Sequence, residues 1–473
     1  MEKVNYEKLG FKCGIEIHQQ IESHKLFCKC PSLVNDPNEE KITIQRYLRA
    51  PAGETGHIDI AALHELKKGK YFVYEAKPTS SCQVELDESP PEEINHDALE
   101  TSLQVALILN CDLVDEVIFM RKTVIDGSNT SGFQRTALIG LNGYVNTSKG
   151  KVKVETVCLE EESAKKINED EKSANYSLDR LGVPLIEIAT DASIKDPEHC
   201  KEVASYLGMV LRSTGKVKRG LGTIRQDVNL SIKGSSRVEL KGFQDLRSIP
   251  KVIENEVKRL TRLKDHKPEV RKVEPNFMSI FLRPMPGSSR MYPETDIKEI
   301  SITKDLLAKI SIPELIDEKA LKLEKEYNLN SYLARELIKS NVNFDLYKTK
   351  FEKLLPSLIA SILVEIPKEI KTRFNLDYKF KESDFDFVLS ALNHGRIPKD
   401  SALEILTEIA KGKRPNLDKY TSVDEKELEN YIKELVKKNK ELSINALMGM
   451  VMKHYKGSVE GSLAMKILKK YHK

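Results

Sequence analysis

The first part of the chain, from Phe11 to about Tyr292, alternates short runs of β-branched residues with clusters of turn residues. Such runs predict β-strands, because branched side chains fit a pleated sheet and turn residues separate the strands. Helical spacing of apolar residues is rarer there. The expected strands are Lys12 to His18, Val117 to Ile125, Tyr144 to Leu159, Leu185 to Ala189, Thr223 to Ile232 and Ser236 to Leu240, and the expected helices are Asp97 to Leu109, Pro197 to Arg212 and Ile249 to Leu263. Since regular strand–helix–strand repetition is absent, we predict an α+β fold on a largely antiparallel sheet.

The pattern changes after about Ile302, where leucines and isoleucines recur at helical spacing between prolines. This spacing of apolar residues predicts a helical domain. The segment from Gly412 to Ser422 has the composition of a linker, and the lysine-rich tail after it is also expected to be helical. We therefore predict three parts: a sheet-based part at 1–300, a helical domain at 301–411 and a small helical tail at 412–473.

Length and composition narrow the class of protein. A chain of 473 residues with 31% charged residues can bury the cores of two to four domains. No run approaches the roughly 18 apolar residues that span a bilayer, and the N-terminus lacks the apolar core of a secretory signal. Seven scattered cysteines favour reduced thiols. We expect a cytoplasmic protein with no membrane contact.

Positive charge is concentrated in two stretches, although the whole chain carries only +4. From Lys201 to Lys264 there are 15 basic and 6 acidic residues, a local +9, and from Lys419 to Lys473 there are 12 and 7, a local +5. Such stretches favour a polyanion through counterion release, and transfer RNA is one candidate. Solvated helix faces are the alternative interpretation.

A polar loop follows the expected strand that ends at Ile125. Gly127 and Gly132 let its backbone turn and approach a ligand. The loop donors are Ser128, Asn129, Thr130 and Ser131, and the flanking cations are Arg121, Lys122 and Arg135. This combination indicates a site for the phosphates of a nucleotide. An ordinary hairpin turn is the alternative. The chain contains no P-loop, because Gly208 to Val217 has the wrong spacing, and no Rossmann glycine motif or nucleophile elbow.

Carboxylates in apolar strands indicate a metal site. Glu16 and His18 alternate with Ile15 and Ile17, so they share one strand face. Glu187 lies within a strongly apolar run, where a carboxylate needs a cationic partner, and the acidic cluster Glu160 to Glu162 precedes it. Oxygen ligands with one imidazole suit Mg²⁺ or Mn²⁺, the ions that accompany ATP. A salt bridge at Glu187 and plain surface at Glu16 and His18 remain alternatives.

Two further strands carry alternating charges. Arg225, Asp227 and Asn229 share one face, as do Glu239 and Lys241. If the two strands lie side by side, their polar faces would surround a cleft with the cations and carboxylates that acyl phosphate chemistry needs. Cross-strand ion pairs on a wet sheet are the alternative.

Cys28 and Cys30 could form half of a zinc site. A second close cysteine pair is missing from the sequence, and Cys82 is distant along the chain. We therefore interpret both as ordinary small residues in a loop.

Several ordered motifs resemble one family, the GatB/GatE family. It contains the E-type subunit of the archaeal glutamyl-tRNA(Gln) amidotransferase and the B-type subunit of the bacterial aspartyl/glutamyl-tRNA amidotransferase. The resemblance is dense over about residues 10 to 300 and looser beyond, where Ala446 to Met452 and Gly457 to Gly461 look like the family's YqeY-like tail. The motifs are Gly14-Ile-Glu-Ile-His18, Met120 to Arg135, Leu178 to Thr190, Gly215 to Asn229 and Arg290-Met-Tyr-Pro-Glu-Thr-Asp296.

The resemblance implies a ligase that acts on a transfer RNA mischarged with glutamate. ATP phosphorylates the glutamate side chain, and ammonia then displaces phosphate to give glutaminyl-tRNA(Gln). The family's metal site falls on Glu16, His18, Glu161 and Glu187, and the implied cofactors are ATP and Mg²⁺. Together with the charge patterns, the resemblance leads us to expect catalytic roles for Glu16, His18, Lys122, Arg225 and Lys241.

The resemblance also implies partners. Ammonia would come from glutamine through an asparaginase-like amidase, the D-type component, which would join this chain in a heterotetramer. This chain shows no amidase nucleophile motif, which agrees with that division of labour. The basic tail would contact the body of tRNA(Gln).

One departure concerns length. The E-type subunit normally carries a large insert that resembles one in bacterial aspartyl-tRNA synthetases, whereas here Leu263 reaches Phe277 through a short polar run. The insert is therefore expected to be missing. Two other interpretations stay open: a B-type protein that also acts on Asp-tRNA, and a non-catalytic tRNA-binding relative.

Overall fold

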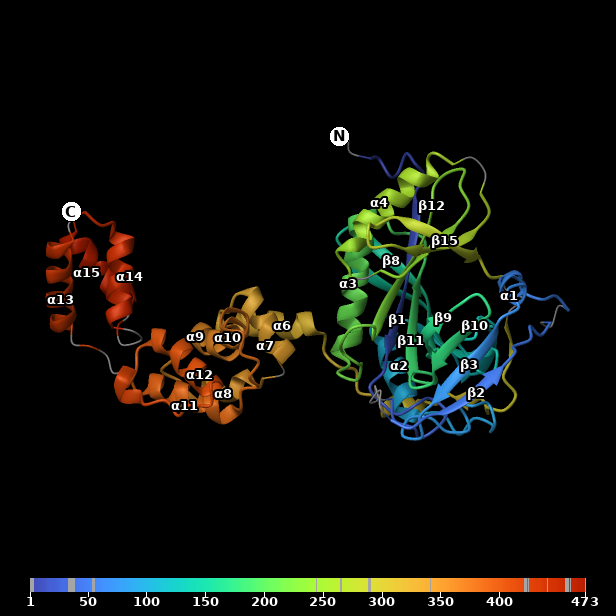
Figure 1. The fold of residues 1–473 in the computed structure, drawn as a ribbon, viewed down its shortest axis with the longest axis horizontal. Helices are drawn as coiled ribbons and strands as arrows, with labels where there is room; N and C mark the ends of the chain where they lie inside the picture. The colour runs from blue at the N-terminus through green and yellow to red at the C-terminus, as the bar shows by residue number, and fades with distance from the viewer. Residues whose placement is uncertain are drawn as a thin grey trace. The chain divides into compact units, whose positions relative to one another are not determined.

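The computed structural model describes residues 4–32, 39–52, 56–243, 245–263, 266–287, 291–340, 342–420, 423, 425–439, 441–455, 459 and 461–472. The chain divides into two compact units, Met1–Leu315 and Ile316–Lys473. The first unit contains the sheets and the second is helical (Figure 1).

The first unit is built on an eleven-stranded sheet in the order β15-β14-β13-β12-β1-β11-β8-β7-β6-β16, with β4 paired to β7. Of its described pairings, only that of β13 with β14 is parallel. The strands are β1 Lys12–Gln20, β4 Asp112–Leu113, β6 Phe119–Thr123, β7 Phe133–Thr147, β8 Gly150–Glu161, β11 Pro184–Thr190, β12 Ile224–Ser231, β13 Val238–Lys241, β14 Glu269–Val273, β15 Ser279–Pro284 and β16 Met291–Pro293.

Two smaller sheets complete this unit, one of four strands and one of two. Their strands are β2 Ile42–Arg46, β3 Tyr71–Ala76, β10 Ser173–Ser177 and β9 Lys165–Glu169, and β5 Glu116–Val117 with β17 Ile300–Ser301. The helices are α1 Ile60–Leu66, α2 His96–Ile108, α3 Pro197–Ser213, α4 Ser248–Leu260 and α5 Lys304–Ala308.

Helices cover one face of the large sheet. Helix α3 packs on β1 and β7, α2 packs on β7 and β8, and α4 packs on α3 (Figure 1). Helix α3 begins where Asp196 caps the backbone N–H of His199 and Pro197 occupies the first turn. Cys13, on the face of β1 that also holds Ile15 and Ile17, is fully buried, as is Cys200 of α3, the helix that packs on this strand. The opposite face of β1, which carries Glu16 and His18, is therefore available to form a site.

The predicted α+β fold with a largely antiparallel sheet is confirmed, and two predicted strands need correction. The run from Tyr144 to Leu159 is a hairpin of β7 and β8, because Gly150, with φ of +107°, closes a turn after Thr147. The run from Val117 to Ile125 is broken at the exposed Ile118 into β5 and β6.

The second unit contains two separate hydrophobic clusters, one between Ala320 and Tyr420 and one between Leu428 and Leu468. None of the helices in the described ranges is long and apolar enough to cross a membrane. The helices are α6 Ile316–Tyr327, α7 Ser331–Ser340, α8 Phe344–Lys350, α9 Pro356–Ala360, α10 Ile366–Phe374, α11 Glu382–Asn393, α12 Ala402–Ala410, α13 Glu425–Lys438, α14 Ile444–His454 and α15 Gly461–Tyr471. The first unit extends past residue 300, because β17 pairs with β5.

Candidate active site

A cavity of about 530 Å³ lies on the face of the large sheet that carries Glu16 and His18. Seven neighbouring strands each contribute a polar side chain to it, so the site is a row across the sheet. These side chains are Lys241 and Glu239 from β13, Asp227 and Arg225 from β12, Glu16 and His18 from β1, Glu187 from β11, Glu160 from β8, Gln134 from β7 and Lys122 from β6.

Strand register brings the predicted residues together. His18 lies opposite Glu187 on one side and opposite Arg225 on the other. Glu16 lies opposite Asp227, and Lys241 comes from the strand that pairs next to it. Because facing residues point to the same side of a sheet, the separate alternations on β1, β11, β12 and β13 combine into one surface.

Glu187 is the centre of the first polar group. His18 Nε2 lies 3.1 Å from Glu187 Oε2, and Lys122 Nζ lies 3.7 Å from the same oxygen. Ligand atoms of Glu16, His18 and Glu187 lie within 4.8 Å of one another. An imidazole and two carboxylates are thus close enough to share one cation.

The electrostatics of this group reflect crowded negative charge. Burial raises the pKa of Glu16 to about 7, with the nearby Glu187 and Glu239 contributing to the shift. Burial lowers the pKa of His18, but the hydrogen bond and charge of Glu187 outweigh it and bring the pKa to about 9. Burial raises the pKa of Glu187, yet Lys122 and His18 hold that pKa well below its usual range. The imidazole and the ammonium thus stabilise the charged form of the central carboxylate.

A second acidic group adjoins the first and shares Glu16 with it. Ligand atoms of Glu16, Asp227 and Glu239 also lie within 4.8 Å of one another. Lys241 Nζ lies 2.5 Å from a carboxylate oxygen of Asp227 and of Glu239. Burial lowers the pKa of Lys241, but these two carboxylates raise the pKa above its usual value. The ammonium group of Lys241 therefore already offsets part of the negative charge of these carboxylates.

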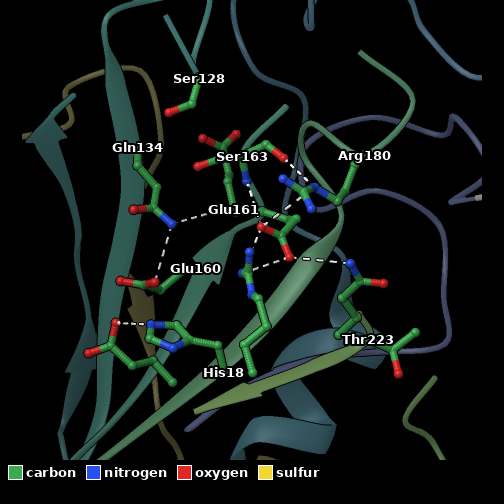
Figure 2. Close-up of polar contacts among 12 residues, drawn as sticks. His18, Ser128, Gln134, Glu160, Glu161, Ser163, Arg180 and Thr223 are labelled. Carbon is green, nitrogen blue, oxygen red and sulfur yellow. Dashed lines mark hydrogen bonds and ion pairs between the residues drawn. The ribbon is translucent and has the colours of Figure 1, made fainter. Parts of the chain in front are cut away.

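A buried carboxylate holds Arg225 in place. Glu162 accepts hydrogen bonds of 2.8 and 2.9 Å from Arg225 Nη2 and one of 3.2 Å from Gln20 Nε2. Arg180 donates to the backbone oxygens of Ser163 and Ala164 beside it (Figure 2). Burial raises the pKa of Glu162, but Arg225 and Arg180 lower the pKa overall. The guanidinium of Arg225 is thus fixed at the wall of the cavity.

The loop after β6 contributes less than the sequence predicts. Ser128 lines the cavity and donates to Asp126 Oδ1 at 2.6 Å. Thr130 donates instead to the backbone oxygen of Glu85 at 2.7 Å, and Ser131 to that of Phe133 at 3.0 Å. Asn129 is buried, like Thr130, and lies outside the cavity lining. Of the four expected donors, the structure brings only Ser128 to the cavity.

Gly127 and Gly132 have the positive φ values that the loop interpretation requires, +90° and +78°. At Gly127, however, the group that lies close to the backbone is a protein side chain and not a ligand. A Cβ built there would lie 2.1 Å from Cδ1 of Phe72, so glycine is needed for packing against β3.

Arg121, Arg135 and Glu161 lie apart from the cavity lining. Arg135 Nη1 lies 3.2 Å from Glu161 Oε1, and Arg135 Nε lies 2.7 Å from Glu294 Oε2. Arg121 Nη2 contacts Glu294 at 2.5 Å and Asp296 at 3.0 Å. The structure therefore does not place Glu161 with Glu16, His18 and Glu187, because it lies on the opposite face of β8 from Glu160.

Glu160, the neighbour of Glu161 on β8, lines the cavity instead. It pairs with Lys122 Nζ at 2.6 Å. It also accepts a hydrogen bond of 3.2 Å from Gln134 Nε2 (Figure 2). The sequence shows the cluster of three glutamates but not that Glu160 and Glu162, rather than Glu161, line the cavity. That choice depends on the register of β8 with β11, in which Glu160 lies opposite Leu185.

Other cavity residues come from segments that the sequence does not connect to the site. Asp59 and Glu65 come from the start and the interior of helix α1, and Arg237 and Arg283 come from the region of β13 to β15. No local motif marks these positions, since only the folded chain brings them to the cavity.

The cavity carries more negative than positive side chains. Its lining includes five cations, Lys122, Arg225, Arg237, Lys241 and Arg283, and nine carboxylates, Glu16, Asp59, Glu65, Asp126, Glu160, Glu162, Glu187, Asp227 and Glu239. This excess of negative charge would repel a polyphosphate on its own. It favours a polyphosphate whose charge is already neutralised by divalent cations. The donor set of Glu16, His18 and Glu187 therefore fits a Mg²⁺ or Mn²⁺ ion.

The interpretation of the cysteines needs revision. Cys82 and Glu85, which are distant in sequence, lie with Cys28 and Cys30, and their ligand atoms are within 4.8 Å of one another. The loop 22–32 is held to the segment that follows Glu85, because Glu92 and Asn95 donate backbone bonds to Phe27 and Leu26.

Comparison with known proteins identifies the family. The description "GatB/GatE catalytic domain" matches residues 11–308, and "GatB domain" matches residues 344–471. The chain belongs to the GatB/GatE family. Curated relatives, each named as the E-type subunit of glutamyl-tRNA(Gln) amidotransferase, include those of Methanocaldococcus jannaschii, 35% identical, and Methanosarcina acetivorans, 33% identical; each alignment covers 99% of both chains.

The missing insert agrees with the lengths of these alignments. The alignment with the Methanosarcina acetivorans protein spans 632 positions, whereas this chain has 473 residues, so at least 159 positions have no residue here. This shortfall is what the absence of a large insert produces.

Proposed function

We propose that this chain is the component of a glutamyl-tRNA(Gln) amidotransferase that phosphorylates the glutamate of Glu-tRNA(Gln) with ATP and then amidates it. The name shared by full-length relatives supports the substrate. The observation that carries the proposal is the cavity itself, in which carboxylates that can hold a divalent cation alternate with fixed cations across one sheet face.

In the first step, an oxygen of the glutamate side chain attacks the γ-phosphorus of ATP. The bond from that phosphorus to the bridging oxygen breaks, and ADP leaves with the electron pair. Lys122 and Arg225, each held by a buried carboxylate, would neutralise charge on the phosphates. Fixed cations lower the barrier because they need no reorganisation when charge moves.

In the second step, ammonia attacks the carbonyl carbon of the acyl phosphate, phosphate leaves and a proton leaves the nitrogen. The group of Asp227, Glu239 and Lys241 supports this step, because carboxylates that already bind one ammonium suit the arrival of another nitrogen. The ammonia would come from a separate amidase, in accordance with the relatives' names, which describe one component of a larger enzyme.

A bound Mg²⁺ would supply charge neutralisation and orientation of the phosphates. Glu16, His18 and Glu187 would hold it, with Glu160 beside them orienting Lys122. Glu161 is left out of this set, since it pairs with Arg135.

The test of function is product analysis. The purified chain is mixed with an asparaginase-like amidase partner, glutamine, ATP, Mg²⁺ and either Glu-tRNA(Gln) or Asp-tRNA(Asn), and the amino acid released from the tRNA is identified. Glutamine from the glutamyl substrate alone is the expected result. Asparagine from the aspartyl substrate would indicate a B-type specificity, and an unchanged amino acid in both would contradict the proposal.

The loop after β6 gives a prediction about ATP. Ser128→Ala is expected to raise the KM for ATP several-fold, because Ser128 is the loop hydroxyl that lines the cavity. Thr130→Ala should leave that KM unchanged and instead lower stability by about 1 kcal/mol through loss of its bond to Glu85. ATP saturation curves and denaturation of both variants separate the two roles. Equal effects on KM would contradict the assignment of the loop.

The lysine-rich tail gives a prediction about tRNA. Removing residues from Ser422 onward should weaken tRNA binding at low salt, and the difference from the full chain should shrink as salt rises, because each phosphate contact releases counterions. The tail has its own hydrophobic cluster, so the remaining core should stay folded. Filter binding over a salt series measures the effect, and identical affinities at low salt would exclude a role for the tail.

A further inference from the structure

Two arginines that line the cavity, Arg237 and Arg283, take no part in the chemistry proposed above. Within the described ranges, neither forms an ion pair with a carboxylate. Arg237 Nε donates to the sulfur of Met285 at 2.9 Å, and a thioether is only a weak acceptor. Nε of Arg283 is buried without a hydrogen-bond partner among the described residues. The other three cations of the lining, by contrast, each contact a carboxylate: Lys122, Arg225 and Lys241.

Strand register places both arginines on the cavity face of the large sheet. Arg237 precedes Glu239 by two residues at the start of β13, so their side chains point to the same face. Arg283 of β15 lies opposite Val270, which in turn lies opposite Glu239. Met285, the contact of Arg237, follows Arg283 by two residues. The two guanidinium groups therefore belong to one end of the cavity, beyond Glu239.

The carboxylates of helix α1, which packs on β15, are already bound by protein groups. Asp59 Oδ1 accepts from two backbone N–H groups in the first turn of α1, at 2.9 and 3.1 Å. Its Oδ2 accepts from the backbone N–H of Gly287 at 2.7 Å. Glu65 pairs with Lys68 at 2.7 Å. At this end of the cavity the anions thus have partners, while the two arginines remain available to a ligand.

We propose that Arg237 and Arg283 bind the phosphodiester that joins the 3′-terminal nucleotide of Glu-tRNA(Gln) to the rest of the RNA, an inference that rests on the function proposed above. A guanidinium suits this group, because its N–H donors form a planar fork that matches two phosphate oxygens. A phosphodiester carries a single negative charge, so two cations can neutralise it without a divalent ion.

Distance across the sheet separates this phosphate from those of ATP. Strand β13 is the third strand from β11, which carries Glu187, and β15 is the fifth. Since neighbouring strands lie about 4.8 Å apart, their backbones are roughly 14 and 24 Å from that of Glu187. The phosphates of ATP, joined by single bridging oxygens, are too close together to reach from the cation at Glu187 to Arg283. In Glu-tRNA, the glutamyl chain and a ribose separate the reacting carboxylate from the nearest phosphodiester, so that a more distant site is required.

The first test measures binding in the absence of catalysis. Arg237→Gln and Arg283→Gln should each weaken the affinity of the full chain for Glu-tRNA(Gln) about 10-fold, the effect of losing one charge-assisted hydrogen bond. The affinity for a non-hydrolysable ATP analogue with Mg²⁺ should stay unchanged. Arg335→Gln is the control, because Arg335 is an exposed arginine of the second unit outside the cavity lining. It should leave both affinities unchanged.

A change in the RNA tests the same contact without depending on the folding of a variant. Glu-tRNA(Gln) assembled with a neutral methylphosphonate in place of its last phosphodiester should bind the unsubstituted chain about 10-fold more weakly than the normal RNA. In the two arginine variants the same replacement should have little further effect, because the guanidinium and the phosphate charge act as a pair.

These affinities are measured without turnover, so their outcome is separate from the test of function. A chain that shows the expected affinities but forms no glutamine would contradict the proposed function and support the phosphate site. Equal affinity of the unsubstituted chain for the two RNAs would overturn the site, as would losses that add independently in the variants. If the arginine variants lost affinity for the ATP analogue and not for the RNA, the arginines would belong to ATP and the proposal would be wrong.

Discussion

Glu187→Gln is expected to lower the rate of glutamate phosphorylation by at least about 100-fold, as loss of a charged ligand from a metal and phosphate site does. The amide keeps the shape of the side chain but removes the charge that His18 and Lys122 share. Binding of the tRNA should stay close to normal, because Glu187 lies in the cavity and not on an exposed surface. ADP formation in single-turnover experiments with Glu-tRNA(Gln), and tRNA affinity by filter binding, measure the two effects.

Glu155→Gln is the matched control, because Glu155 is exposed on β8 and lies outside the cavity lining. It should leave both the rate and the affinity unchanged. If Glu187→Gln turned over at the normal rate, Glu187 would not be a ligand and the proposed metal set would be wrong.

Arg135→Met is expected to destabilise the first unit by about 3–5 kcal/mol, the cost of removing one partner from a buried ionic network. Arg135 contacts both Glu161 and Glu294, and the side chain of Glu294 is fully buried. Without the guanidinium, Glu161 loses the cation that it faces. Because the chain has more than one unit, denaturant curves should be combined with hydrogen exchange along β7.

Arg121→Met is the comparison for this variant. Arg121 is more exposed and shares Glu294 with Arg135, so its loss should cost less. The folded fraction of both variants should retain the normal KM for ATP, since neither arginine lines the cavity. A raised KM for ATP with unchanged stability in Arg135→Met would instead support the sequence-based interpretation of Arg135 as a phosphate ligand.

Strand alternation explains why much of the site could be predicted. Glu16 and His18, Arg225 and Asp227, and Glu239 and Lys241 each share a face because side chains two apart in a strand point the same way. Only the pairing of β1 with β11 and β12, which is a long-range property, brings the separate faces together. The sequence therefore identified most of the side chains but not their order across the sheet.

Several predicted side chains lie outside the cavity, and strand register and local hydrogen bonds explain why. Among three consecutive glutamates, strand register decides which ones line the cavity: Glu160 and Glu162 do, whereas Glu161, the predicted ligand, lies on the opposite face of the strand. In the loop after β6, composition predicts donors but not their acceptors, and Thr130 and Ser131 bond to backbone oxygens. Cys82 and Glu85 join Cys28 and Cys30 only through tertiary packing.

The most direct test of the proposed chemistry uses the purified chain with Mg²⁺, ATP labelled at the γ-phosphate and Glu-tRNA(Gln), with ammonium chloride in place of an amidase. We expect ADP formation that requires both Mg²⁺ and the glutamyl-tRNA, and glutamine on the tRNA when ammonium is present. Absence of ATP cleavage with Glu-tRNA(Gln) bound would contradict this function and indicate a tRNA-binding protein without this chemistry.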